Sequence, residues 1–228
     1  MKNNSIYKNQ KYLQNNPNWH VEDSPYKAGL IIKAINRSDI NFKNMIDIGC
    51  GAGMVVKILS EKYPDKFFHG IDISPDAAKF WSNVNNINLK YSNNTDKVFD
   101  LAICLDVFEH VEDYFGFLRS IKPKAKFFIF NIPLDMNVVK LLSPGIRYAR
   151  ENVGHLHYFN SFTAMETLKQ CGYKVLDSYL STAFLKTKPR NIKQLLLLIP
   201  RLLTLILGKK IGSILFGGTS IVVTALAE

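Results

Sequence analysis

The amino-acid sequence predicts an α/β fold with a doubly wound, mostly parallel sheet of seven strands. Apolar runs of strand length alternate with amphipathic helical patterns along most of the 228 residues. Such alternation is typical of parallel strands joined by right-handed crossovers, and a sheet covered on both faces has nearly continuous apolar strands. A glycine-rich segment directly after the first strand indicates a ligand at the carboxyl ends of the strands.

Seven runs have the length and composition of strands. The fourth and fifth are strongly apolar, and the last is rich in β-branched residues and is expected to run antiparallel to its neighbours. The expected strands are residues 45–48, 67–71, 87–91, 99–105, 126–132, 173–180 and 219–226.

Helical patterns lie between these strands. The helix between the second and third strands is expected to start at Ser74 and Pro75, which suit an N-cap and a first helical position. The helix before the sixth strand is closed by Gly172. A further helix is expected to start at Ser24 and Pro25, before the first strand. The remaining expected helices are residues 53–63, 111–121 and 161–170.

The chain has no internal repeat and no sign of a second core, so we expect one domain over residues 1–228. Within it we expect an N-terminal cap or lid over residues 1–40 and the core over residues 41–182. A leucine-rich helical insert over residues 183–218 and the final strand over residues 219–228 complete the domain.

The composition limits the compartment and the partners. Three widely spaced cysteines form no CxxC pair, so neither a disulfide framework nor a metal site is expected, and a reducing, cytoplasmic compartment fits. Residues 1–16 lack the apolar stretch of a signal peptide. The net charge of +10 can attract phosphates, nucleic acid or an anionic membrane, but no nucleic-acid module is recognisable, so no nucleic-acid partner is expected.

The segment from Asp47 to Gly53 indicates a nucleoside ligand. Gly49, Gly51 and Gly53 permit a tight turn and a close approach of the ligand, and the next helix offers free N–H groups. Asp72, nineteen residues after Gly53, ends the second strand, where its carboxylate can accept both hydroxyls of a ribose. A tight turn without a ligand is the structural alternative.

The spacing of the glycines helps to decide between two nucleoside ligands, a dinucleotide and S-adenosylmethionine. The dinucleotide fingerprint G-x-G-x-x-G/A needs a third small residue, and Met54 stands at that position. Asp47 would repel a pyrophosphate but attract the amino group of a methionine moiety. The residues therefore favour S-adenosylmethionine and leave an NAD(P)-dependent oxidoreductase as an alternative.

Four segments in this order resemble the class I S-adenosylmethionine-dependent methyltransferases, whose fold is Rossmann-like. They are residues 47–53, residues 69–73, the run CLDVFEHVED at residues 104–113, and residues 154–161 with 172–175. The resemblance implies an enzyme that transfers a methyl group from S-adenosylmethionine.

The resemblance also assigns residues. Gly49, Gly51 and Gly53 would pass close to the cofactor, with Asp47 near its amino-acid end. The ribose would be held by Asp72, and the adenine ring would pack on Ile73. In place of the acidic residue that many relatives use to hold the adenine amino group, Asn93 or Asn94 is expected. The sulfonium region would be lined by Leu105 and Asp106.

Residues 16–28 resemble N-terminal segments of bacterial methyltransferases that occur with surface-polysaccharide genes. Trp19, His20 and Lys27 are therefore candidate lid or substrate residues. This resemblance and the basic charge predict O-methylation of a sugar or glycan intermediate, or of another small molecule. The alternatives are a quinone or lipid precursor as acceptor, and a non-catalytic binding module.

A hydroxyl acceptor benefits from a general base, and histidine is best suited near neutral pH. The catalytic candidates are His110, after the fourth strand, and His155 and His157, which share a face if their segment is extended. His20 is a further candidate.

The leucine-rich run at residues 195–207 is too short, and too interrupted by Pro200 and Arg201, to span a membrane. Two arrangements suit this run. The first is a helical flap that packs on the sheet or on a second subunit of a homodimer. The second is peripheral contact of residues 191–210 with the inner face of a membrane. We expect the helical flap, while the flanking charges suit the second arrangement: Lys186, Lys188, Arg190, Lys193, Lys209 and Lys210.

Overall fold

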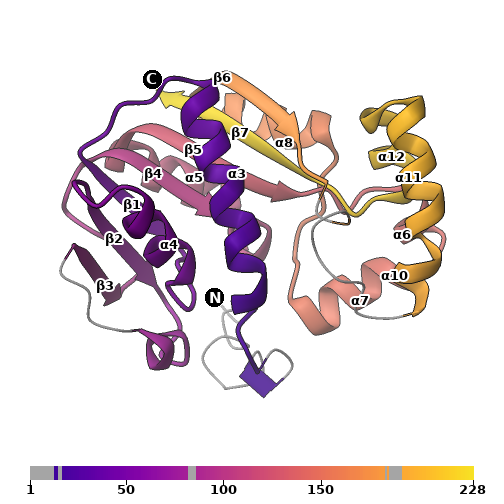
Figure 1. Ribbon diagram of the computed structural model, residues 1–228, viewed down its shortest axis with the longest axis horizontal. Helices are drawn as coiled ribbons and strands as arrows, with labels where there is room; N and C mark the ends of the chain where they lie inside the picture. Colours follow the sequence, from indigo (N-terminus) through magenta and orange to yellow (C-terminus); the bar gives the residue numbers. More distant parts are fainter. Residues whose placement is uncertain (1–12, 15–16, 82–85, 183, 185–191) are drawn as a thin grey trace.

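The computed structural model describes residues 13–14, 17–81, 86–182, 184 and 192–228 (Figure 1). Its centre is one seven-stranded sheet in the order β3-β2-β1-β4-β5-β7-β6. Every neighbouring pair from β3 to β5 is parallel, whereas β7 is antiparallel to both β5 and β6. The strands are β1 Asn44–Ile48, β2 Phe67–Asp72, β3 Ile87–Tyr91, β4 Phe99–Leu105, β5 Ala125–Pro133, β6 Tyr173–Leu180 and β7 Ser220–Ala227.

This topology confirms the predicted doubly wound α/β sheet with a reversed last strand. Because β1 pairs with β2 on one side and with β4 on the other, the order of the strands reverses at β1. A ligand of such a sheet binds beyond the carboxyl ends of the strands at this reversal.

Helices cover both faces of the sheet and create two apolar clusters. On one face α3 Ser24–Arg37 and α4 Met54–Lys62 pack their buried stripes against β1, β4 and β7; Ile31 and Leu59 are fully buried there. On the other face α5 Tyr114–Ile121 and α8 Ser161–Gln170 do the same through Leu118 and Leu168. The burial of β1, β4, β5 and β7 between these layers explains their apolar sequences.

Two predicted helices differ in the structure. After Ser74 and Pro75 there is only a 3₁₀ turn, Ala77–Phe80, because the N–H of Ser74 bonds to Asp72 and the indole of Trp81 returns to the carbonyl of Gly51. The helix expected from residue 111 begins at Tyr114, where Asp113 caps it by accepting the N–H of Gly116 at 2.8 Å.

The short helices that follow β5 and those of the leucine-rich insert gather at the other end of the sheet from β3 (Figure 1). They comprise α6 Val138–Leu141, α7 Gly145–Tyr148 and a π-helical turn, Ala149–Val153, after β5. The leucine-rich insert supplies α10 Ile192–Leu196, α11 Leu198–Leu207 and α12 Lys209–Phe216. Lys186, Lys188 and Arg190 lie outside the described residues. Among the described helices, none has the length and apolarity needed to cross a membrane.

Candidate active site

A cavity of about 790 Å³ lies at the carboxyl ends of β1, β2, β4 and β5. The turn between β1 and α4 lines one end of it, and the loops that follow β4 and β5 line the other. The start of α3 and two residues of α11, Leu198 and Arg201, complete the wall. The cavity therefore joins the predicted cofactor residues to a second group of polar side chains.

The glycine turn is held in a shape that only glycine adopts easily. Gly49, Gly51 and Gly53 have φ values of 80°, 53° and 74°, all in the left-handed region. The N–H groups of Gly49 and Cys50 donate to the carbonyl of Ile71 at 2.8 and 3.1 Å, which ties the turn to the end of β2. A side chain at Gly49 would begin 2.6 Å from a methyl group of Val107. The backbone of this turn therefore forms a wall without side chains.

Asp72 anchors the same turn from the end of β2. Its two carboxylate oxygens accept the N–H groups of Gly51 and Ser74, each at 2.8 Å. Burial raises the pKa of Asp72, and these backbone bonds oppose the rise. Each carboxylate oxygen keeps capacity for a second hydrogen bond, so both could accept a hydroxyl of a ribose.

Asp47 lies at the end of β1 with a carboxylate oxygen, Oδ1, that has no hydrogen-bond partner among the described residues. Its side chain is buried, and burial raises its pKa to about 7 while the charge of Lys27 opposes the rise. An unpaired buried carboxylate is costly, so this position suits a ligand that brings its own positive charge. The ammonium group of a methionine moiety has that charge.

The part of the cavity predicted to hold the sulfonium lies around Asp106, a non-glycine residue with a φ of 57°. Its side chain accepts the amide of Asn131 at 2.7 Å and pairs with Lys27 at 2.7 Å, so α3 is joined to the end of β4. Leu105 also lines this part of the cavity. A strained backbone held by two partners is typical of functional sites.

Two of the three residues expected to contact adenine line the cavity. Ile73 lines the cavity beside Asp72, as does Asn93. Asn94, the other asparagine expected at adenine, is absent from the lining, and its side-chain oxygen accepts the N–H of Thr95 at 2.8 Å. Of the two asparagines, Asn93 is therefore the better placed.

Trp19, His20 and Lys27 all line the cavity, as the lid prediction requires. Trp19 and His20 have φ values of 49° and 55°. The indole Nε1 of Trp19 lies 2.9 Å from the position that a Cβ on Gly51 would take. The N-terminal segment thus lies directly against the glycine turn, while its role as a lid stays a prediction.

Two of the three candidate catalytic histidines line the cavity. His110 and His155 line the cavity with ring centroids 4.7 Å apart. His157 is absent from the lining, and its Nε2 donates to the carbonyl of Val111 at 2.9 Å. The expected common face of His155 and His157 is wrong because Leu156 and His157 both donate their N–H groups to the carbonyl of Glu109, so the segment is not an extended strand.

Asp135 and Lys140 are site residues that the sequence reasoning missed. The carboxylate of Asp135 bonds to His155 Nδ1 at 2.6 Å and to the ammonium of Lys140. Burial acts to raise the pKa of Asp135, yet these two partners lower it to about 2. The one available signal was position, since Asp135 follows β5 at the carboxyl edge of the sheet.

Burial lowers the pKa of His110 to about 3.

Comparison with known proteins agrees with this geometry. Residues 21–178 match the model of a family described as "Methyltransferase domain". The chain belongs to this family of S-adenosylmethionine-dependent methyltransferases. The match spans the glycine turn, Asp72, Asp106, His110 and His155. The unpaired oxygen of Asp47 and the bare turn fit the cofactor.

Sequence relatives include the ubiquinone biosynthesis O-methyltransferases of Rickettsia bellii (strain OSU 85-389) and Rickettsia felis. The first is 30% identical over 115 residues, which cover 45% of this chain and 48% of that protein. The second is 26% identical over 145 residues, which cover 54% and 59%. The chain thus spans about half the length of the curated relatives it matches.

Solved structures with the same fold include the plantazolicin methyltransferase BpumL, in complex with a monoazolic desmethylPZN analog and SAH. Its TM-score is 0.63 at 15% identity, with 99% of this chain and 93% of that chain covered. A SAM-dependent methyltransferase from Archaeoglobus fulgidus has a TM-score of 0.57 at 19% identity, with 92% and 99% covered. At these identities the likeness establishes the fold.

Proposed function

We propose that this methyltransferase transfers the methyl group to an oxygen atom of a small hydroxylated acceptor. Among such acceptors we favour aromatic quinone precursors. The observation that carries the proposal is the single cavity that joins the glycine turn, Asp47 and Asp72 to His110, His155 and Asp135. A donor and an acceptor bound at its two ends would lie in one enclosed space, which is the main requirement of an in-line displacement.

The bound cofactor would supply an electrophilic methyl carbon on a sulfonium. The chain then has to align the acceptor oxygen with it. Because His155 donates its Nδ1 proton to Asp135, the unshared electron pair of the neutral imidazole would lie on Nε2. We place the acceptor oxygen beside His155, and a general-base role for a histidine remains a prediction for this residue. His157 is not proposed for that role, since its Nε2 is occupied by backbone carbonyls.

Two observations support an acceptor with an aromatic ring and an apolar tail. The relatives named above are ubiquinone biosynthesis O-methyltransferases. The cavity wall also includes Leu198 of α11, whose neighbouring side chains Leu196 and Ile199 are each 69% exposed. The predicted sugar or glycan acceptor gains no support from either observation.

The same exposed side chains support the predicted peripheral contact with a membrane. Leu141 and Leu142 of the α6 segment add apolar surface, and α6 packs on α12. Lys209 and Lys210 at the start of α12 are exposed and would meet anionic headgroups. We propose that this surface, formed by α6, α10, α11 and α12, rests on an anionic membrane from which the acceptor enters.

A transfer assay tests the acceptor class. Purified protein with labelled S-adenosylmethionine would be incubated with hydroxylated aromatic quinone precursors, nucleotide sugars, phospholipids, protein and RNA. We expect label in the hydroxylated aromatic compounds, on oxygen, and a loss of most turnover in His155→Gln while SAH affinity stays unchanged. Labelling of sugars, protein or RNA alone would contradict the proposal.

A further inference from the structure

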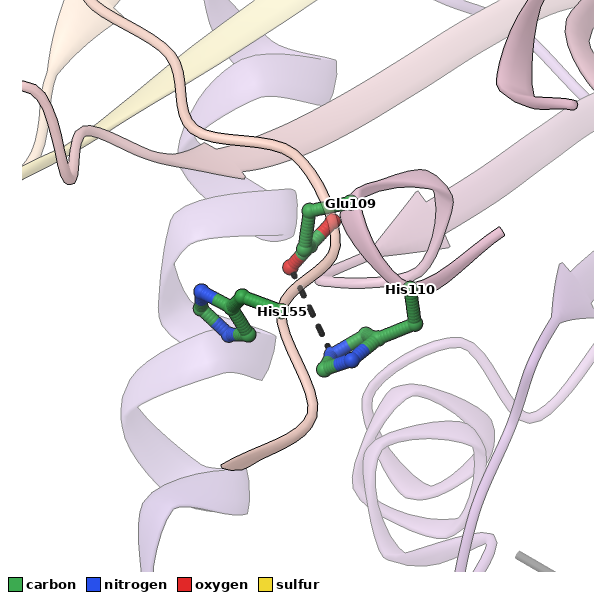
Figure 2. Close-up of side chains that lie close together, drawn as sticks. All are labelled: Glu109, His110 and His155. Carbon is green, nitrogen blue, oxygen red and sulfur yellow. Dashed lines mark ion pairs between the residues drawn. The ribbon is translucent and has the colours of Figure 1, made fainter. Parts of the chain in front are cut away.

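Glu109, His110 and His155 meet at the acceptor end of the cavity. Glu109 and His110 belong to the short 3₁₀ turn that follows β4, and His155 belongs to the loop after the π-helical turn (Figure 2). One donor atom from each side chain lies within 4.8 Å of the other two. Donor atoms around a tetrahedral zinc ion stand roughly 3.4 Å apart, so side-chain movements on the order of 1 Å would close the set around an ion.

Glu109 is a buried carboxyl that makes no hydrogen bond within the described part of the chain. Its side chain is 0% exposed, and neither carboxylate oxygen has a hydrogen-bond partner among the described residues. His110 Nε2 is the neighbouring ring nitrogen, 3.8 Å from Glu109 Oε1. A buried carboxyl that makes no hydrogen bond is rare and costs free energy unless a ligand completes it.

Both imidazoles are held in the form that binds metal ions. His110 donates from Nδ1 to the carbonyl of Gly154 at 3.1 Å, and His155 donates from Nδ1 to Asp135 at 2.6 Å. In the neutral imidazole, Nε2 is then the ring atom through which each histidine would bind an ion. Histidines that ligate metals usually donate their other ring N–H to a carbonyl or carboxylate in this way.

The two segments that carry these side chains are fixed to each other. The N–H groups of Leu156 and His157 donate to the carbonyl of Glu109 at 2.8 and 3.1 Å. Gly154 provides the turn between the π-helical segment and His155 with a φ of 88°. The relative positions of the three donors are thus set by backbone contacts.

We infer that Glu109, His110 and His155 form a binding site for a divalent transition-metal ion of the zinc type. Two imidazoles and a carboxylate suit such ions, whereas Mg²⁺ prefers oxygen ligands. Three protein ligands leave a coordination position open. His110 and His155 line the cavity, so that position faces the place where we put the acceptor oxygen. The ion would hold and orient this oxygen, and because it takes the electron pair of His155 Nε2, it would replace the general-base role of that residue. That role of the ion rests on the proposed methyl transfer, whereas binding of the ion does not.

Titration of the 228-residue chain with Co²⁺ tests the site, because cobalt reports its coordination by visible absorption. After treatment with a chelator, we expect one Co²⁺ per chain with a low-coordinate spectrum, displacement by Zn²⁺, and no displacement by Mg²⁺. Glu109→Gln and His155→Gln should each weaken Co²⁺ binding at least 100-fold. His157→Gln, a matched change outside the cluster, should bind Co²⁺ like the unaltered protein.

SAH affinity, measured by calorimetry on the same samples, separates this inference from the proposed function. We expect Glu109→Gln to keep SAH affinity while it loses Co²⁺, and a variant that fails to bind SAH would be replaced by Glu109→Asp. The inference would be overturned if the unaltered protein bound SAH but not stoichiometric Co²⁺, or if Glu109→Gln and His155→Gln bound Co²⁺ unchanged.

Discussion

The two ends of the cavity are built in different ways. At the cofactor end, the backbone of Gly49–Gly53 forms the wall, and Asp72 fixes it through two N–H groups. At the acceptor end, the wall consists of side chains from separate segments: Asp106 after β4, Asp135 after β5, and His155 after the π-helical turn. The cofactor end is formed by one short segment and the end of the next strand. The acceptor end is formed by residues that lie up to about fifty positions apart in the sequence.

Both ends contain a buried carboxylate without a hydrogen-bond partner among the described side chains. Asp47 marks the cofactor end and Glu109 the acceptor end. Because an unpaired carboxylate is costly in either place, each indicates a positively charged ligand. The comparison suggests an ammonium group for Asp47 and, by our inference, a metal ion for Glu109, where two imidazoles lie close by.

The largest effect should come from removing Asp72. Asp72→Ala deletes the carboxylate that we expect to accept the ribose hydroxyls, and it deletes the anchor of Gly51. Two hydrogen bonds to a charged group are worth at least about 3 kcal/mol together. We expect SAH affinity to fall at least about 100-fold by calorimetry. Circular dichroism should show an unchanged fold. A change smaller than threefold would mean that the cofactor end is not organised around this carboxylate.

A smaller effect should appear in the pH dependence of cofactor binding. Burial raises the pKa of Asp47 to about 7, so below that pH the free protein carries a neutral carboxyl. Since an ammonium ligand needs the ionised form, SAH affinity should rise with pH from 5.5 and level off above 7, by up to about tenfold per pH unit.

Two variants sharpen this test. Asp47→Asn should bind SAH weakly and should not show this pH dependence. Because the charge of Lys27 lowers the pKa of Asp47, Lys27→Met should move the rise to higher pH. A flat profile in the unaltered protein between pH 5.5 and 7.5 would contradict the role given to Asp47.

The smallest effect concerns the surface beside the acceptor end. Vesicles that contain anionic phospholipid should carry the protein upward in flotation, and vesicles of neutral phospholipid should carry much less. Lys210→Gln should reduce binding about fivefold, because one lysine near an anionic surface contributes about 1 kcal/mol. High salt should reduce binding further. Equal recovery with neutral and anionic vesicles would rule out the electrostatic part of this contact.

The sequence predicted the cofactor end well because its signal is local. Strand periodicity, three glycines that need positive φ, and an acid at the next strand end all lie within residues 44–72. The reversed β7 and the helical character of the insert were also predictable. Pro200 does not break α11, because a proline in the first turn of a helix is tolerated, and Arg201 turns inward to the carbonyl of Phe216.

The acceptor end was predicted poorly because its residues meet only in the folded chain. No local pattern links His155 to Asp135 or to Glu109, so a metal site was not expected from the sequence. His157 looked equivalent to His155, yet a backbone turn directs it to the carbonyl of Val111. Asn94 looked equivalent to Asn93, but its side chain stabilises its own turn.

Calorimetric titration of the unaltered chain with SAH tests the central claim most directly. A cavity whose floor is a bare glycine turn between Asp47 and Asp72 should bind one SAH per chain and should bind NAD without measurable heat. Absence of SAH binding, or binding of NAD that SAH does not displace, would contradict the assignment of this cavity to the methyl-donor cofactor.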